Sequence, residues 1–292
     1  MKETFLLEPR EGEHRLYTRL RDPRAEELLD YFLRLWSQFS DSAPKGFRKK
    51  LQIEFYQRWW EMSLFVGLAR LGLSPECPRS DQGPDIFLSL DSSDVFIEAT
   101  APNVGNNPDV VPEFVLNSVS KLPERQCLLR LTQGLTVKRK CIDNYLSKET
   151  IHKRASCVIA ISSGGLNQFG SLLDAAHPAM LSVLAGAGHT VISMDGRRPP
   201  FSKHRPVFQK ASGNDVDACL FDSDDFRNIS AVLYSNEDPW NGKDEPERSF
   251  QLFLNPNATR PLPGRLSDLM ETWAREIHSN GEVEWEKTKP TQ

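Results

Sequence analysis

Several features that assign a protein class are missing from this chain of 292 residues. No run of about 18 apolar residues is present to span a bilayer, and the apolar part of the N-terminus is too short for a signal peptide. A GxSxG elbow, an HRD/DFG pair and a glycine-rich dinucleotide fingerprint are absent too. We therefore expect a cytoplasmic protein without a membrane partner, and we set aside serine hydrolases, kinases and dinucleotide-binding enzymes.

Cysteine and histidine are too few and too scattered to indicate a metal cluster. The five cysteines are widely spaced without a CxxC pair, and the six histidines form no HExxH motif. We expect reduced, buried cysteines rather than zinc ligands or disulfides. The net charge of −4 argues against a generally basic nucleic-acid coat protein, but it leaves room for a local basic groove.

The most informative stretch is a predicted hairpin, in which two β-rich runs, 83–90 and 95–100, flank a polar turn. If Asp91 and Asp94 close the turn, Phe87 faces Glu98 across the ladder. Because side chains alternate along a strand, one face is apolar and becomes core. The other face collects four residues: Asp85, Phe87, Glu98 and Thr100.

Two acids on this second face suggest a site for a hard metal ion. In the predicted register Asp85 lies diagonal to Glu98, with Cα atoms roughly 7–8 Å apart, within reach of a shared ion. Converging carboxylates repel each other unless a cation or a proton lies between them. The alternative is that Asp85 only caps the strand and Glu98 is a solvated outward residue.

A helix predicted from about Gly46 to Leu71 adds a third acid. Glu61 stands beside its apolar stripe, so its carboxylate points toward the apolar side of the helix. An unpaired buried carboxylate is costly and would protonate or find a cation. A salt bridge between Glu61 and Arg58 is the simpler explanation.

The remaining pattern predicts alternating elements and two basic features. We expect helices over 24–40, 113–122, 135–146, parts of 170–190 and 266–277, and strands over 127–132, 157–162, 229–235 and 249–254. Lys138 falls on the inward face of its helix, where it either snorkels to the surface or faces an anion. The loop 196–212 is the clearest basic segment, either simply solvated or in contact with phosphate.

Taken in order, these motifs resemble the PD-(D/E)xK nuclease superfamily, which has the restriction-endonuclease-like fold. The resemblance is most specific over 60–102 and extends over roughly 47–265. More narrowly, the chain looks like a little-characterised bacterial branch of it. The matching segments are Trp60-Glu61, Gly83-Pro84-Asp85, Ile97 to Pro102, Arg130-Leu131-Thr132 and Asn255-Pro256-Asn257-Ala258.

The resemblance implies a catalytic site that binds Mg²⁺ or Mn²⁺. Asp85 and Glu98 would be ligands, with Glu61 as a further or water-bridged ligand and the carbonyl of Ala99 completing the shell. At position 100 the family usually has lysine, whereas this chain has threonine. The missing positive charge would then come from Lys138. Two residues would lie at the substrate phosphate: Arg130, on a neighbouring strand, and Thr100.

The expected fold class is α/β (α+β), with a restriction-endonuclease-like core, a mixed central sheet flanked by helices, and helical elaborations at both ends. We divide the chain into an N-terminal helical extension (1–45), a nuclease-like domain (46–278) and a disordered tail (279–292). The expected function is metal-dependent hydrolysis of phosphodiester bonds in DNA. A catalytically impaired domain that binds nucleic acid or a partner is the alternative, a nucleotide phosphoesterase is a third, and a homodimer is left open.

Overall fold

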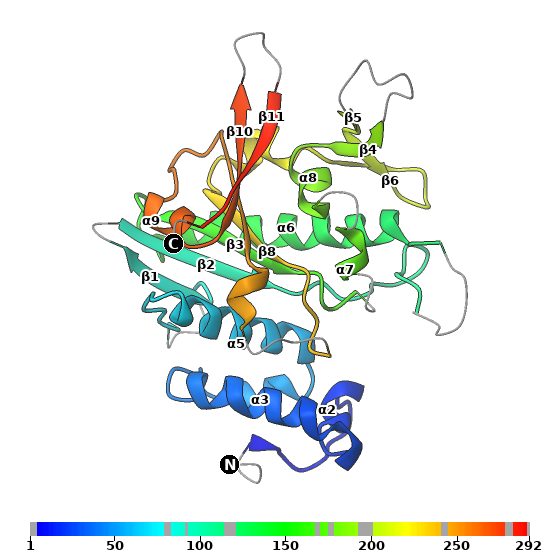
Figure 1. Ribbon diagram of the computed structural model, residues 1–292, viewed down its shortest axis with the longest axis vertical. Coiled ribbons are helices and arrows are strands. Elements are labelled where there is room, and N and C mark those ends of the chain that lie inside the picture. The colour runs from blue at the N-terminus through cyan, green and yellow to red at the C-terminus, as the bar shows by residue number, and fades with distance from the viewer. Residues whose placement is uncertain are drawn as a thin grey trace.

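The computed structural model describes residues 5–78, 83–90, 93–113, 121–166, 170–174, 178–191, 201–240, 245–277 and 283–290. The fold is mixed α/β, with a seven-stranded mixed sheet flanked by helices (Figure 1). Within the described part of the chain, every helix is too short or too polar to cross a bilayer.

The large sheet has the strand order β1-β2-β3-β8-β9-β10-β11. Its central strands β2, β3 and β8 are parallel, β1 and β2 form an antiparallel hairpin, and β10 is parallel to β9. Two small hairpins, β4-β5 and β6-β7, lie outside it. The strands are β1 (Ile86–Leu90), β2 (Ser93–Thr100), β3 (Ser156–Ser162), β4 (Ala187–Val191), β5 (Phe201–His204), β6 (Val207–Gln209), β7 (Asp215–Asp217), β8 (Ala231–Ser235), β9 (Gln251–Leu254), β10 (Glu271–Ile277) and β11 (Val283–Thr288).

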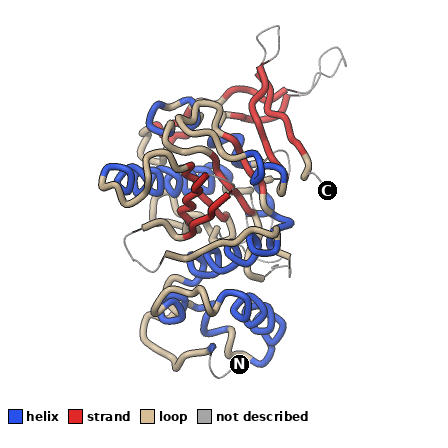
Figure 2. Tube along the Cα trace, turned by 90° about the vertical axis from the view of Figure 1, so that its left-hand side faces the viewer, coloured by secondary structure: helices blue, strands red, loops and turns tan. Residues whose placement is uncertain are grey.

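Helices cover both faces of this sheet. The α-helices are α2 (Arg15–Arg19), α3 (Glu26–Phe39), α4 (Phe47–Leu51), α5 (Phe55–Arg70), α6 (Glu124–Ser147), α7 (Gly170–Leu173), α8 (Ala179–Leu184) and α9 (Gly264–Asp268). In Figure 1, α5 lies below the sheet and α6 lies above it, and α2 and α3 form a further layer beneath α5. Figure 2 shows the same layering from the side.

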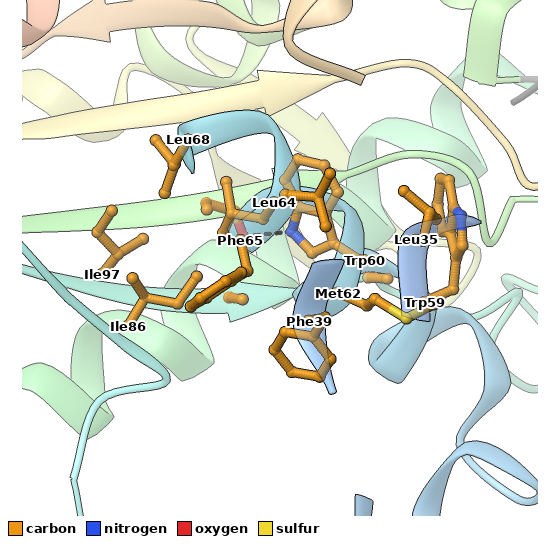
Figure 3. Packing of buried hydrophobic residues seen from close by; sticks show 14 of the residues in the cluster. Leu35, Phe39, Trp59, Trp60, Met62, Leu64, Phe65, Leu68, Ile86 and Ile97 are labelled. Carbon is orange, nitrogen blue, oxygen red and sulfur yellow. Dashed lines mark hydrogen bonds between the residues drawn. The ribbon is translucent and has the colours of Figure 1, made fainter. Parts of the chain in front are cut away.

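Helix α5 is buried on nearly all sides because it lies between the sheet and the N-terminal helices. Its Trp60 Nε1 donates to the Ala160 carbonyl of β3 at 3.1 Å, while Trp59 Nε1 donates to the Tyr31 hydroxyl of α3 at 3.1 Å. Figure 3 shows part of the buried cluster to which Leu64 and Leu68 of α5 and Ile86 and Ile97 of the sheet belong. The helix therefore carries any polar side chain of its own into a largely water-free environment.

Several predicted elements are confirmed. Helix α3 matches the periodic segment 24–40, and the buried run 157–162 forms β3, which is buried at every position. The two late strands form β8 and β9, which pair antiparallel. The predicted hairpin is also present as β1 and β2, although Asp91 lies outside the described residues and Asp94 belongs to β2 rather than to the turn.

The register predicted for this hairpin is wrong by two residues. Phe87 pairs with Phe96 rather than with Glu98, and Leu88 rather than Leu90 faces Val95. The ladder continues to Leu90 opposite Ser93, which leaves a shorter connection than we predicted. Because the side-chain period is two, this shift preserves the face of every residue.

Segment 127–132 is helical rather than a strand, because it belongs to the first half of α6. Its buried residues recur at helical spacing, for example Leu128, Leu131 and Leu135. A short apolar run is equally compatible with a strand and a buried helix segment. The predicted helix 135–146 is confirmed as the second half of the same helix, and most of 113–122 lies outside the described residues.

Other boundaries also differ from prediction. Segment 46–71 forms two helices, α4 and α5, separated at 52–54, and 170–190 gives α7, α8 and then β4. The expected C-terminal helix is short α9 followed by β10, and the expected disordered tail contains β11, paired with β10. Strand β10 pairs in parallel with β9, and Trp273 stacks on Phe253 there, with 6.0 Å between the ring centroids. Of the predicted basic loop 196–212, residues 196–200 lie outside the described part, and the rest contains β5 and β6.

The cysteines are free thiols, as predicted, but their burial is only partly as expected. Cys127 and Cys157 are buried, whereas Cys77, Cys141 and Cys219 are partly exposed.

Candidate active site

Four predicted site residues, from four different elements, meet at one edge of the large sheet. Asp85 directly precedes β1, Glu98 lies in β2, Glu61 in α5 and Lys138 in α6. Ile86 pairs with Ile97, so continuing the ladder by one residue places Asp85 opposite Glu98 rather than diagonal to it. The two acids are thus closer neighbours than the predicted register implies.

Lys138 is the charged partner of both hairpin acids. Its Nζ lies 2.8 Å from Glu98 Oε1 and 3.7 Å from Asp85 Oδ2, and its side chain is 18% exposed. It therefore points inward at anions rather than snorkelling to the surface. The predicted juxtaposition of Lys138 with these acids is present in the structure.

Asp85 is oriented by the backbone of the neighbouring strand. Its Oδ2 accepts a hydrogen bond from the Ala99 N–H at 2.8 Å. This contact fixes one oxygen of the carboxylate against β2, and the side chain is 24% exposed. This contact is compatible with a capping role for Asp85, whereas Glu98, whose side chain is 5% exposed, is not the solvated residue that the alternative assumed.

Glu61 is buried and paired with two neighbours on its own helix. Both of its oxygens accept from Arg58 Nη1, at 2.8 and 2.6 Å, and Oε1 also accepts from Gln57 Nε2 at 2.9 Å. The salt bridge to Arg58 that we considered as the simpler explanation is therefore formed. It coexists with the inward orientation of Glu61, whose side chain is only 9% exposed.

Gln57 is a site residue that sequence reasoning missed. Its Oε1 accepts from the Ala101 N–H at 2.9 Å, and its Nε2 donates to the Ala99 carbonyl at 3.0 Å as well as to Glu61. Since a backbone N–H can only donate, this pattern fixes the orientation of the amide. Gln57 thereby connects α5, the end of β2 and Glu61. No motif in the sequence singles out this glutamine.

Burial and mutual repulsion raise the pKa of two of the acids. Burial, followed by the negative charge of Asp85, raises the pKa of Glu61 to about 7 and that of Glu98 to about 7. Burial lowers the pKa of Lys138, but the charges of Asp85 and Glu98 outweigh it, and the net shift is upward. At neutral pH Lys138 is therefore a fixed cation, while Glu61 and Glu98 exchange protons readily.

The acids line a cavity of about 220 Å³. Arg58, Glu61, Asp85 and Glu98 contribute its charged lining, and Cys77 and Tyr145 border it. Residues before α5 also reach it, namely Phe39, Pro44 and Lys50. The cavity is thus an acidic recess with cations on its walls.

The donor set fits a divalent ion only in part. Across the described residues, no group of three or more histidine, cysteine, aspartate or glutamate side chains converges closely enough to hold a metal ion. Glu98 Oε2, however, is buried and has no hydrogen-bond partner in the described chain. A buried anionic oxygen without a partner is costly, so it is a suitable point for a cation to bind.

Two predicted phosphate contacts lie elsewhere. Arg130 is on α6 rather than on a strand, where its Nε donates to the Asn103 carbonyl at 2.8 Å and its Nη1 contacts Gln133 at 2.6 Å. Thr100 is buried, 9% exposed. Neither residue lines the acidic cavity, although Thr100 lies two residues after Glu98 on β2 and therefore on the same face of that strand.

Comparison of the chain with protein-family models, curated proteins and solved structures gives no match.

Proposed function

We propose that the protein is a Mg²⁺- or Mn²⁺-dependent nuclease that hydrolyses phosphodiester bonds in DNA, with a restriction-endonuclease-like core of the PD-(D/E)xK type. The observation that carries the proposal is the position of Lys138. Its ammonium lies 2.8 Å from Glu98 and 3.7 Å from Asp85. A lysine from α6 thus supplies, beside the two acids, the positive charge that Thr100 cannot provide.

The order of elements also supports the proposal. Helix α5 with its inward Glu61 precedes the β1-β2 hairpin, and α6 and the buried strand β3 follow. Strand β2 is parallel to β3 along Val95 to Thr100. This is the order of elements that the resemblance to the superfamily implies, and it is the arrangement that places Asp85 and Glu98 side by side.

Asp85, Glu98 and Glu61, with the Ala99 carbonyl, are the residues that would hold the ion, because carboxylate and carbonyl oxygens suit Mg²⁺ and Mn²⁺. When bound, the ion supplies Lewis-acid polarisation of the phosphate and a more acidic water. Glu98 Oε2 is the oxygen available for it, since Oε1 is engaged by Lys138.

The side chains have distinct roles in this proposal. Lys138 stays protonated because its pKa is raised, so it stabilises negative charge on the phosphate rather than acting as a base. Without an ion, burial and the charge of Asp85 raise the pKa of Glu61 to about 7, and a bound divalent ion would favour its ionised form. Arg58 keeps Glu61 in place through both carboxylate oxygens.

A cleavage assay tests the proposal. Purified protein is incubated with plasmid, linear and single-stranded DNA in Mg²⁺, Mn²⁺ or EDTA, together with Asp85→Ala and Glu98→Ala. Asp94→Ala is the matched control, because Asp94 is an exposed acid on the same strand as Glu98. We expect metal-dependent cleavage that both site variants abolish and the control retains. Absence of cleavage on every substrate contradicts the proposal.

A non-catalytic domain that binds nucleic acid or a partner is the second candidate. Two observations favour this second candidate. The close Lys138–Glu98 ion pair already neutralises one of the acids, and position 100 has threonine where the superfamily usually has lysine. Calorimetric titration with Mn²⁺ separates the two candidates. Binding that disappears in Asp85→Ala favours the nuclease, whereas absence of divalent-ion binding together with absence of cleavage favours the binding domain.

A further inference from the structure

A cluster of cations lies next to the acidic cavity, on the segment between α3 and α5. Lys45, Arg48, Lys49 and Lys50 fall within six residues that contain no acid. We call these four residues the basic wall. Phe47 and Leu51 are buried and anchor α4 to the core, while Lys45 and Lys49 are exposed. Arg48 and Lys50 are half-buried, so the wall combines two exposed and two partly covered cations.

The basic wall reaches the cavity that holds the acids through Lys50. Lys50 and Pro44 line this cavity together with Glu61, Asp85 and Glu98. A polyanion that follows the wall is consequently led to the carboxylates. Because net repulsion between the acids and a phosphate opposes entry, flanking cations are needed to offset it.

The shape of the cavity limits which polynucleotide can enter it. Its volume is about 220 Å³, and the side chains of Glu98 and Glu61 at its base are only 5% and 9% exposed. A DNA duplex is a stiff rod that does not bend a single phosphate into such a recess without distortion. A single strand is flexible, so one of its phosphates can enter the recess without such distortion.

Tyr145 adds the second feature of a single-strand site. It lies on α6 seven residues after Lys138, partly exposed, and borders the same cavity. Sites for single strands combine cations that follow the backbone with aromatic rings on which bases stack. The wall provides the first and Tyr145 the second.

We infer that the basic wall and Tyr145 form an entry path for one polynucleotide strand, so that the preferred substrate is single-stranded DNA or an unpaired DNA end. The inference rests on the proposed function for the chemistry that follows binding. The binding step itself stands on the wall, the cavity and Tyr145 alone.

The experiment measures binding separately from cleavage. Full-length protein in EDTA is titrated against a fluorescein-labelled DNA strand of about 15 nucleotides, its blunt duplex and the matching RNA strand, with anisotropy as the readout. The variants are Lys45→Glu with Lys49→Glu, and Tyr145→Ala. Lys140→Glu is the control, since this exposed lysine lies on α6 but does not line the cavity.

We expect the single strand to bind at least fivefold more tightly than the duplex. The double lysine variant should weaken binding by roughly tenfold or more at ~50 mM salt and reduce the salt dependence by about one unit per lysine. Tyr145→Ala should weaken the binding of the single strand by roughly fivefold or more. Lys140→Glu should change this affinity by less than the double lysine variant and by less than Tyr145→Ala.

Equal affinity for duplex and single strand, or an equal loss in Lys140→Glu, overturns the inference. Tighter binding of RNA than of DNA overturns the choice of DNA as substrate. Strand binding through the wall without cleavage in Mn²⁺ supports the entry path and overturns only the proposed hydrolysis. Cleavage of duplex DNA that the wall variants leave unchanged supports the hydrolysis and overturns only the path.

Discussion

Lys138 is the residue on which the proposed chemistry most depends. In the proposed mechanism it supplies, from a helix, the positive charge that Thr100 cannot provide, and it contacts Glu98 Oε1 directly. We expect Lys138→Ala to lower kcat for DNA cleavage by about a hundredfold or more, the scale of a lost transition-state contact. Mn²⁺ affinity, measured by calorimetry, should be unchanged or tighter, because the variant removes a competing cation.

This pairing of outcomes separates catalysis from folding. A purely structural lysine would weaken Mn²⁺ binding and cleavage together, and cleavage at the unaltered rate would remove Lys138 from the site. Lys140→Ala provides the control on the same helix, away from the cavity.

The raised pKa values of Glu61 and Glu98 make stability depend on pH. Both are about 7 in the folded protein, above the ordinary value of 4.5. Between these values the folded state binds more protons than the unfolded chain, so the free energy of unfolding falls as pH rises from about 4.5 to 7. Each carboxyl contributes on the order of 1–3 kcal/mol.

Thermal unfolding in EDTA at a series of pH values measures this effect. We expect a lower Tm at pH 8 than at pH 5.5. This difference in Tm should be smaller in Glu98→Gln than in the control variant Asp94→Asn. If the proposed site holds Mg²⁺, the ion should restore Tm at pH 8, because it would bind the ionised folded site and not the unfolded chain. A Tm that rises from pH 5.5 to 8 in EDTA, equally in both variants, contradicts the assignment.

Gln57 is expected to set the geometry of the proposed metal site. Gln57→Leu removes its bonds to Glu61, the Ala99 carbonyl and the Ala101 N–H. We expect Mn²⁺ affinity to fall by roughly tenfold or more, as for other residues that orient metal ligands. Calorimetry measures it, with Gln133→Leu, an exposed glutamine on α6, as control. Unchanged affinity in the folded variant would show that Gln57 only supports the fold.

The contrast between Lys138 and Gln57 marks how far the sequence predicts the site. Lys138 was predictable because its position on the inward face follows from helical periodicity alone. Gln57 was not, because its partners Ala99 and Ala101 are backbone groups more than 40 residues away. A side chain that binds distant backbone leaves no pattern of residue types to find.

At the scale of elements, prediction succeeded where a single periodicity dominated. The helical stripe of α3 has one interpretation, and the β-branched residues and the following Gly-Gly turn favour a strand for the short apolar run of β3. The two faces of the hairpin were also predicted correctly despite the error in register, because a shift of two residues leaves every side chain on the same face. The predictions for 127–132 and for the C-terminal strands were wrong, because the apolar residues there fit a helix as well as a strand. Only contacts with the sheet or with other strands determine which of the two forms.

The contact between α5 and the residues before β9 allows a test at this scale. A Cβ at Gly67 would lie 2.5 Å from the ring of Phe250. Alanine otherwise favours helices, so destabilisation would reveal this close approach. We expect Gly67→Ala to lower the free energy of unfolding in urea by about 1–3 kcal/mol, and Gly264→Ala, with no atom within 4 Å, to be near neutral. Stabilisation by Gly67→Ala would show that Phe250 moves aside freely.

At the scale of the whole molecule, the N-terminal helices and the sheet share one hydrophobic core. Phe5, Leu16 and Phe32 belong to the same buried cluster as Trp60 of α5 and Ile97 of β2. The proposed boundary at residue 45 therefore does not coincide with a gap in the packing. Because Phe39 and Pro44 also line the acidic cavity, the same segment contributes to the site.

We therefore expect the chain to unfold in a single transition, and a core substitution far from the site should shift that transition as a whole. Phe32 is fully buried, with its ring 5.1 Å from that of Phe55 at the start of α5. Phe32→Ala should lower the free energy of unfolding by about 3–5 kcal/mol, with tryptophan fluorescence and far-UV circular dichroism following coincident curves. Ser37→Ala, at an exposed position of α3, is the control. If the N-terminal helices were instead a separate unit, two unfolding transitions would appear, and Phe32→Ala would shift only the transition of these helices. The cavity would then form without α3.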